Sequence, residues 1–301
     1  RSTLFPYTTL FRSYAMRHSP LNHNPGRCTG LGASALSGRL AANTMSGSFC
    51  PLPFPSAGDR WFRACGAYGL KINVLIEHIL HAIAKPKDLA GLHIAVTAGP
   101  TQEPLDPVRY LTNHSTGKMG YAVARAAAMR GADVTLIHGP TALPPVKFTE
   151  DVPITTAQDM YEAVTSRFAD MDILVMAAAV ADYRPATVAD DKIKKKDGDL
   201  SIPVERTADI LGTIGPRKTK QFLCGFSMET RDMVENSAAK LKKKNLDMVV
   251  ANNLKVSGAG FGVDTNVVTF ITPDGTRELP LMSKADVADA ILDEILKRRG
   301  H

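Results

Sequence analysis

The sequence predicts an α/β protein with a doubly wound, mostly parallel, Rossmann-like sheet and a small antiparallel addition at its C-terminal end. Two observations support this prediction. From about residue 91 onward, short apolar runs alternate with helical patterns, and Gly or Pro stands at many of the junctions. The chain also has 301 residues, 44% hydrophobic and 22% charged, which is typical of a globular protein with one large or two small domains.

The expected elements follow one another in β-α-β order. Leu92–Thr97 is an apolar run typical of a strand, and the helical pattern at Met119–Arg130 ends at Gly131. The alternation then predicts a strand at 133–137, a helix at 157–168, a strand at 173–177, a helix near Ile210, a strand at 222–226, a helix at 233–244 and a strand at 248–251. Repeated β-α-β units favour a parallel sheet, because parallel strands need crossover connections.

The C-terminal end has a different pattern. Residues 267–271 and 278–281 are two short apolar runs, and Pro273-Asp274-Gly275 between them is a turn sequence. Ser283 is the expected N-cap of an amphipathic helix that ends at about Arg298. We therefore expect an antiparallel pair and a closing helix.

Residues 1–60 differ in composition from the rest of the chain. They contain six Arg, one acidic residue, Asp59, and no Lys or Glu, while Gly, Ser and Pro are frequent. Such a segment is expected to be disordered. Thr3–Ser13 resembles the in-frame translation of a DNA sequencing adaptor, so the segment is interpreted as disordered or artefactual. A transit peptide is the alternative.

Charge, cysteine content and hydropathy exclude several classes of protein. The net charge of +6 comes almost entirely from residues 1–60, so the remainder is nearly neutral and no nucleic-acid partner is expected. None of the four cysteines forms a C-x-x-C pair, so a zinc site and a disulfide framework are not indicated and a cytoplasmic setting is expected. The absence of an apolar run of about 18 residues argues against a transmembrane span.

Polar and small residues follow the ends of the predicted parallel strands, where ligands bind in open α/β sheets. Gly99-Pro100-Thr101 follows the first strand, and Asn113 to Gly120 opens the next helix. Small residues at a helix N-terminus suit an anion, although a loop that only caps the helix is the alternative. The G-x-G-x-x-G and Walker spacings do not occur here, which disfavours an NAD(P)-dependent reductase.

Alanines and lysines mark the other candidate loops. The alanines at 177–179 can accept a flat ring against the backbone, and Asp182 is placed for ribose hydroxyls. The lysines at 192 and 194–196 favour a polyphosphate ligand, but a solvated edge strand is the alternative. Lys240 and Lys242–Lys244 are similarly open to interpretation as the polar last turn of a helix.

Four separated motifs resemble the phosphopantothenate-cysteine ligase family, from about residue 88 to 298. They agree with that family in order and spacing: Thr97-Ala98-Gly99-Pro100-Thr101, Asn113-His114-Ser115-Thr116-Gly117-Lys118-Met119-Gly120, Ala178-Ala179-Val180-Ala181-Asp182-Tyr183 and Lys192-Ile193-Lys194-Lys195. The resemblance implies CTP-dependent ligation of 4′-phosphopantothenate with L-cysteine through an acyl-cytidylate. Pyrophosphate leaves in the first step and CMP in the second.

The resemblance also implies roles for particular residues. Asn113 would hold the carbonyl oxygen of the acyl-cytidylate, Arg109 would assist in substrate binding and loop order, and Lys192 would meet the triphosphate. The implied CTP site comprises Gly99, Pro100, Thr101, Ala177, Ala178, Asp182, Lys192, Ala208, Asp209, Ile210, Leu211, Phe226, Lys240 and Lys244. Mg²⁺ is the implied metal, without assigned ligands, and members of the family are dimers.

Residues 61–88 resemble the tail of the flavin-dependent decarboxylase that accompanies this ligase in bifunctional proteins. Cys65 corresponds to the acid of that decarboxylase, and FMN would be needed only with the rest of its domain. The expected organisation is therefore residues 1–60, the remnant at 61–88, and a ligase domain at 89–301. A nucleotide-binding module without catalysis, left by gene fragmentation, is the alternative function.

Overall fold

The computed structural model describes residues 72, 74–195, 200–229, 233–253, 260 and 262–300, apart from the side chains of residues 229 and 253. Residues 64–301 form one compact unit. The disorder expected for residues 1–60, and Cys65, lie outside the described residues.

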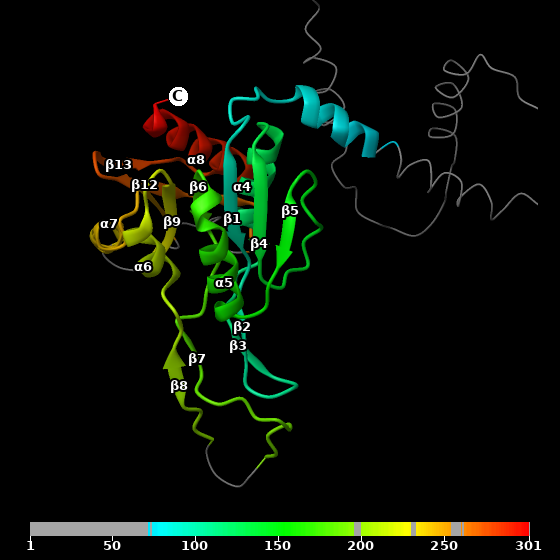
Figure 1. Ribbon diagram of the computed structural model, residues 1–301, viewed down its shortest axis with the longest axis vertical. Helices are drawn as coiled ribbons and strands as arrows, with labels where there is room; N and C mark the ends of the chain where they lie inside the picture. Colours follow the sequence, from blue (N-terminus) through cyan, green and yellow to red (C-terminus); the bar gives the residue numbers. More distant parts are fainter. Residues whose placement is uncertain are drawn as a thin grey trace, which may run out of the picture. The chain divides into compact units, whose positions relative to one another are not determined.

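An eight-stranded sheet forms the centre of this unit (Figure 1). Its strand order is β13-β12-β10-β9-β6-β1-β4-β5. The six strands from β10 to β5 in this order are parallel to one another. At the opposite edge, β12 is antiparallel to β10, and β13 is antiparallel to β12. The strands are β1 His93–Ala98, β4 Asp133–His138, β5 Glu150–Pro153, β6 Ile173–Met176, β9 Phe222–Glu229, β10 Met248–Asn253, β12 Val268–Thr272 and β13 Gly275–Glu278. The predicted doubly wound, mostly parallel sheet with an antiparallel C-terminal addition is confirmed.

Helices cover both faces of the sheet. On one face lie α4 Lys118–Met129 and α8 Lys284–Arg299. On the other lie α5 Ala157–Arg167, α6 Ile210–Ile214 and α7 Met233–Lys243. Short 3₁₀ helices at Phe168–Asp170 and Gly215–Arg217 follow α5 and α6.

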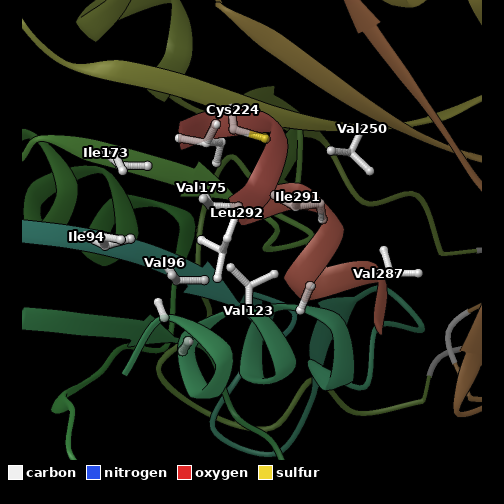
Figure 2. Close-up of a cluster of buried hydrophobic side chains, with 14 of the residues drawn as sticks. Ile94, Val96, Val123, Ile173, Val175, Cys224, Val250, Val287, Ile291 and Leu292 are labelled. Atoms are coloured by element: carbon white, nitrogen blue, oxygen red, sulfur yellow. The ribbon is translucent and has the colours of Figure 1, made fainter. Parts of the chain in front are cut away.

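Alternating side chains along each parallel strand build two apolar cores. Ile94 and Val96 of β1 pack toward α4 and α8, while Ala95 between them packs on the opposite face. Figure 2 shows the first of these cores, where Val123 of α4 and Ile291 of α8 meet the strand residues. Each fully buried Ile or Val contributes about 1.5–3 kcal/mol through removal of apolar surface from water. Burial on both faces explains why these strands are continuous apolar runs in the sequence.

The helix ends follow from local sequence. Ser283 caps α8 by accepting a hydrogen bond from the Asp286 N–H, as predicted, and Thr156 forms a capping box with Asp159 at the start of α5. In contrast, the N-cap of α4 is Gly117, whose φ of 79° is left-handed. Since glycine has no side chain to cap the helix, the first N–H groups of α4 face the space beyond its N-terminus.

The structure corrects two local predictions. The second strand of the C-terminal hairpin is β13 at Gly275–Glu278, rather than residues 278–281, because Thr272 pairs directly with Gly275 across a two-residue turn. The lysines at 192, 194 and 195 lie in an irregular segment, so the interpretation of these residues as an edge strand is wrong.

Several short strands were not predicted from the sequence. One is β5, the edge strand of the main sheet. The others form three small antiparallel pairs: β2 Gln102–Pro104 with β3 Tyr110–Thr112, β7 Tyr183–Pro185 with β8 Val204–Arg206, and β11 Thr265–Asn266 with β14 Met282–Ser283. The first two pairs, with the described residues that connect their strands, project from the sheet and are called the arm below (Figure 1).

None of the helices in the described part of the chain combines the length and apolar character that crossing a bilayer requires.

Candidate functional site

The strand order reverses between β1 and β6, which are neighbours in the sheet although β4 and β5 lie between them in sequence. Such a switch point leaves a crevice beyond the carboxyl ends of the two strands. The segments that leave them stay paired: Pro100 and Ala179 form a parallel bridge, and the Ala179 N–H donates to the Gly99 carbonyl at 2.9 Å. Two cavities lie at this edge.

The first, here called the β6–α6 cavity, has a volume of about 420 Å³. It is bounded by the end of β6, the segment after it, the start of α6, Lys240 of α7 and Lys244, which follows α7. Nine of the predicted CTP-site residues line it: Ala178, Asp182, Ala208, Asp209, Ile210, Leu211, Phe226, Lys240 and Lys244. The structure therefore brings together residues from four separate parts of the chain.

Each lysine of this cavity has an acceptor in the protein. The Lys240 Nζ donates to the Phe226 carbonyl at 2.8 Å, and Lys244 forms an ion pair with Asp209. Burial lowers the pKa of Lys244, and the nearby Asp182 carboxylate opposes that shift. A phosphate bound here would supply the negative charge that a half-buried ammonium group favours.

Asp209 fixes the local backbone at this cavity. It is the N-cap of α6, and its Oδ1 accepts the Gly212 N–H at 2.8 Å. The loop at 208–211 is thus held by a side chain that also contacts Lys244. The start of α6 and the residue that follows α7 are thus linked through this one carboxylate.

The second cavity, here called the α4 cavity, has a volume of about 360 Å³ and lies at the N-terminus of α4. Ala178 and Phe226 line both cavities, so the two are adjacent. The α4 cavity is lined by residues 113–120 after β3, residues 177–179 after β6, residues 226–228 near the end of β9 and Asn252 near the end of β10. Asn113 and Ala177 of the predicted site lie here.

Asn113 is held by two hydrogen bonds. Its Nδ2 donates to the Ala179 carbonyl at 2.6 Å, and its Oδ1 accepts the Ser115 N–H at 3.1 Å. The orientation of the Asn113 side-chain amide is therefore set by the segment that follows β6 and by the loop that contains Asn113. Since Nδ2 carries two hydrogens, one can be donated to a substrate carbonyl while the other bonds to Ala179.

Sequence reasoning did not select several polar residues of the α4 cavity. Lys118 belongs to one of the four motifs, and its Nζ donates to the Asp264 carboxylate at 2.7 Å. Lys284 is only 6% exposed, and burial lowers its pKa, with the charge of Lys118 acting in the same direction and Asp264 opposing it. Asn266 donates to the side-chain oxygen of Asn252 at 2.9 Å. Asn252 could have been selected, because it follows a predicted strand end.

Gly99, Pro100 and Thr101 lie behind the wall of the site and line neither cavity. Gly99 has a left-handed φ of 75°, and a Cβ there would lie 2.9 Å from Cγ2 of Thr141. The Thr101 hydroxyl is buried and accepts the Ala181 N–H at 3.0 Å. This segment therefore positions the chain that follows β6.

Arg109 and Lys192 lie on the arm, outside both cavities. The Arg109 guanidinium forms an ion pair with Asp106 at 2.5 Å and donates to the Ile193 carbonyl at 3.1 Å. Lys192 is exposed. The structure thus joins Arg109 to the lysine-containing segment.

The carboxylates of the site bear on metal binding. Within the described ranges no group of three or more His, Cys, Asp or Glu side chains is arranged to hold a metal ion. Asp182 and Asp209 are the carboxylates that line the β6–α6 cavity. The donor set therefore does not form a protein cage for Mg²⁺.

Comparison with known proteins gives consistent results. Residues 89–298 match the family model of the DNA/pantothenate metabolism flavoprotein C-terminal domain. The Coenzyme A biosynthesis bifunctional protein CoaBC of Bacillus subtilis (strain 168) is 47% identical over 251 residues, which cover 80% of this chain and 61% of that protein. The chain thus spans less than two thirds of the length of this curated relative.

Solved structures share the fold. A crystal structure of the C-terminal domain of Coenzyme A biosynthesis bifunctional protein CoaBC is 46% identical, with a TM-score of 0.60, and the match covers 70% of this chain and 98% of that one. The DNA/pantothenate metabolism flavoprotein from Streptococcus pneumoniae is 24% identical, with a TM-score of 0.61, over 69% of this chain and 100% of that one. The second likeness concerns the fold alone.

Proposed function

Because the chain belongs to the DNA/pantothenate metabolism flavoprotein C-terminal domain family, we propose that it ligates 4′-phosphopantothenate to L-cysteine at the expense of CTP, as a step of coenzyme A biosynthesis. The observation that carries the proposal is the pair of adjacent cavities. One is lined by nine of the fourteen residues that the motif resemblance assigns to the nucleotide, the other contains Asn113, and Ala178 and Phe226 belong to both.

The first step joins substrate and nucleotide. The cytidine occupies the β6–α6 cavity, and an oxygen of the phosphopantothenate carboxylate attacks the α-phosphorus of CTP. The bond to the β-phosphate oxygen breaks and pyrophosphate leaves. Lys240, Lys244 and Lys192 stabilise the charge that builds on the phosphate oxygens, since fixed cations act most strongly where charge develops.

The second step forms the amide. The cysteine amine attacks the carbonyl carbon of the acyl-cytidylate, the bond to the phosphate oxygen breaks, and CMP leaves as the amine loses a proton. Asn113 donates to the carbonyl oxygen from the α4 cavity. The N-terminus of α4 and Lys118 add positive potential there, because helix N-termini stabilise negative charge.

Mg²⁺ is proposed to enter on the triphosphate of CTP. Magnesium commonly binds through substrate phosphates and one or two carboxylates, which agrees with the lack of a three-ligand cluster among the described residues.

The proposal includes a homodimer. The arm exposes several large apolar side chains, with exposed fractions between 48% and 61%: Val108, Tyr110, Tyr183, Val188 and Leu200. A projecting arm with this much apolar surface is suited to a partner of the same kind. Light scattering coupled to size-exclusion chromatography should give twice the chain mass; the mass of one chain would contradict this part of the proposal.

The domain organisation is a further part of the proposal. Residues 89–301 are the ligase domain, residues 61–88 belong to the end of a decarboxylase, and residues 1–60 are foreign to both. The match of the family model from residue 89 supports the first boundary. FMN and Cys65 have no role in the proposed ligation.

A direct assay tests the proposed function. The purified chain is incubated with CTP, Mg²⁺, 4′-phosphopantothenate and cysteine, and pyrophosphate and amide product are measured; ATP replaces CTP in a parallel reaction. We expect both products with CTP. Nucleotide binding without pyrophosphate release would instead indicate a binding module without catalysis.

A further inference from the structure

Asp106 is a buried carboxylate of the arm to which the proposed mechanism gives no role. It follows β2 in the turn toward β3, and its side chain is 0% exposed although the neighbouring Arg109 side chain is 42% exposed. Burial of a charged group is costly unless it is paired and hydrogen-bonded. The contacts of Asp106 show how that cost is met.

Both carboxylate oxygens of Asp106 are used. Oδ1 accepts the Val108 and Arg109 N–H groups, each at 2.9 Å, which closes the turn on itself. Oδ2 accepts the Arg109 Nε at 3.0 Å and Nη2 at 2.5 Å, and also the Ile193 N–H at 3.1 Å. The last of these bonds joins residues 87 positions apart in the chain.

Both backbone polar groups of Ile193 are hydrogen-bonded to side chains of the arm. Its N–H donates to Asp106, and its carbonyl accepts from the Arg109 Nη2 at 3.1 Å. The two side chains thus offer one acceptor and one donor, as a neighbouring β-strand would. A backbone bond from the Ala189 N–H to the Leu105 carbonyl, 3.1 Å long, supports the same approach of the two segments.

We propose that Asp106 is a positioning residue which, through Arg109 and the backbone of Ile193, holds the segment 191–195 in the place from which Lys192 reaches the triphosphate. The proposal rests on the proposed function for its catalytic consequence. The physical clip between Asp106, Arg109 and Ile193 can be tested without any activity.

A carboxylate is required for this task. The Arg109 guanidinium holds the pKa of Asp106 well below its usual range, with the N–H groups acting in the same direction, so the group remains ionised near neutral pH. An amide at this position would place an NH₂ group against either the guanidinium or two backbone N–H groups, all of which are donors. Asp106→Asn is therefore a near-isosteric change that breaks the clip.

The first measurement is hydrogen exchange at the Ile193 amide in the full-length chain. Its exchange should be about tenfold faster, or more, in Asp106→Asn than in the unmodified protein, because its acceptor is lost. Arg184→Gln is the matched control, since Arg184 pairs with Glu205 at 2.8 Å elsewhere on the arm. That variant should leave Ile193 exchange unchanged. Equal exchange in Asp106→Asn and the unmodified protein would overturn the clip, whatever the activity.

The second measurement is a double-mutant cycle on pyrophosphate release. Asp106→Asn should lower kcat about tenfold in the unmodified background and less than about twofold in the Lys192→Gln background, because both changes affect one interaction. The KM for cysteine should stay within about twofold. If the two reductions in kcat multiply in the double variant, Asp106 acts only on general stability, and the positioning role is overturned.

The two measurements separate the inference from the proposed function. An unmodified chain that releases no pyrophosphate from CTP contradicts the proposed function, while the exchange at Ile193 still decides whether the clip exists. An active chain in which Arg184→Gln lowers kcat as much as Asp106→Asn also overturns the inference, since any disturbance of the arm would then suffice.

Discussion

The sheet edge and the arm contribute residues to the same proposed site, but they are held in place by different interactions. At the sheet edge, Phe226 lies in β9 and Ala178 directly follows β6, two strands that are buried on both faces. Asn113 follows β3 and is joined to this edge by its hydrogen bond to the Ala179 carbonyl. On the arm, Lys192 lies in an irregular, exposed segment that the Asp106–Arg109 clip contacts. Apolar packing fixes the first region, and a few polar contacts fix the second.

This difference predicts how each region responds to substitution. A change at the sheet edge alters packing that also stabilises the fold, so stability and activity should change together. A change at an exposed residue of the arm, such as Lys192, removes charge at the surface, where the cost in stability is small. The following predictions test this distinction, from the largest expected effect to the smallest.

Asn113→Asp is expected to have the largest effect, and mainly on amide formation. A carboxylate would oppose the negative charge that develops on the acyl carbonyl, at a cost of about 10³ in rate or more, and would also face the Ala179 carbonyl oxygen. Pyrophosphate release should persist for one turnover and acyl-cytidylate should accumulate. Single-turnover quench experiments with labelled CTP measure both steps. Equal loss of the two would mean that Asn113 only shapes its loop.

Lys192→Gln should slow pyrophosphate release by about 10² to 10³, the cost of one charge-assisted contact in the transition state. Because Lys192 is exposed on the arm, the melting temperature and the circular dichroism spectrum should not change. An unaltered rate would leave the lysine as part of a solvated surface. A lowered melting temperature would contradict the distinction between the two regions.

Gly120→Ala tests the sheet edge. A Cβ at Gly120 would lie 2.6 Å from Cβ of Ala98 and 2.8 Å from the Thr97 carbonyl oxygen, so α4 must move away from β1. Overpacking of this kind costs about 1–3 kcal/mol, and urea unfolding should show it together with reduced activity. Gly262→Ala is the control, because no atom lies within 4 Å of its added Cβ. Equal stability of the two variants would contradict the prediction.

Asp88→Asn should destabilise the protein by about 1 kcal/mol at neutral pH, since the pair with buried Arg130 is partly exposed on the Asp88 side. Arg130 lowers the pKa of Asp88. The stabilisation is therefore complete above the ordinary Asp pKa of about 4 and is lost as the pH falls through the lowered pKa. Urea unfolding of both proteins between about pH 7 and pH 3 should show the difference shrinking.

The exposed pair of His93 and Asp133 provides the comparison for Asp88. Its side chains are 58% and 70% exposed, so Asp133→Asn should change the free energy of unfolding by less than about 0.5 kcal/mol. A pH-independent loss in Asp88→Asn would show that the ion pair is not its cause.

Removal of residues 1–84 should have the smallest effect of these changes. A chain that begins at Leu89 should keep the fold and the ligase activity, with a loss of stability like that of Asp88→Asn. A chain that begins at residue 85 should match the full-length protein, because it retains Asp88 and the pair of Lys85 with Asp289 at 2.7 Å. Unfolding of the chain that begins at residue 85 would show that the preceding residues are structural.

Much of the fold could be predicted because its pattern is local. The helix expected at 119–130 is α4 at Lys118–Met129, and the strand expected at 248–251 is β10 at Met248–Asn253. The apolar periodicity of an element lies within the element itself. Its end signals, such as Gly131 and the N-cap Ser283, lie next to it. Strands of three or four residues, such as β2 and β5, carry too little pattern to be found this way.

The candidate site was predictable at the level of strand ends. The rule that ligands bind beyond the carboxyl ends of parallel strands, together with the family resemblance, selected Asn113, Ala178 and Phe226, and the structure brings these into one cavity. The sequence could not distinguish residues that line a cavity from residues such as Thr101 that support its wall. That distinction depends on side-chain direction and burial.

The sequence by itself determined the alternation of strands and helices, because each element must bury one face or both, and apolar periodicity records this requirement. The tertiary structure decided how distant segments meet. Asp106 and Ile193 are 87 residues apart, and Asp209 at the start of α6 pairs with Lys244, which follows α7. Such contacts depend on the packing of the whole sheet, because the sequence around a buried charged residue does not indicate which distant residue will pair with it.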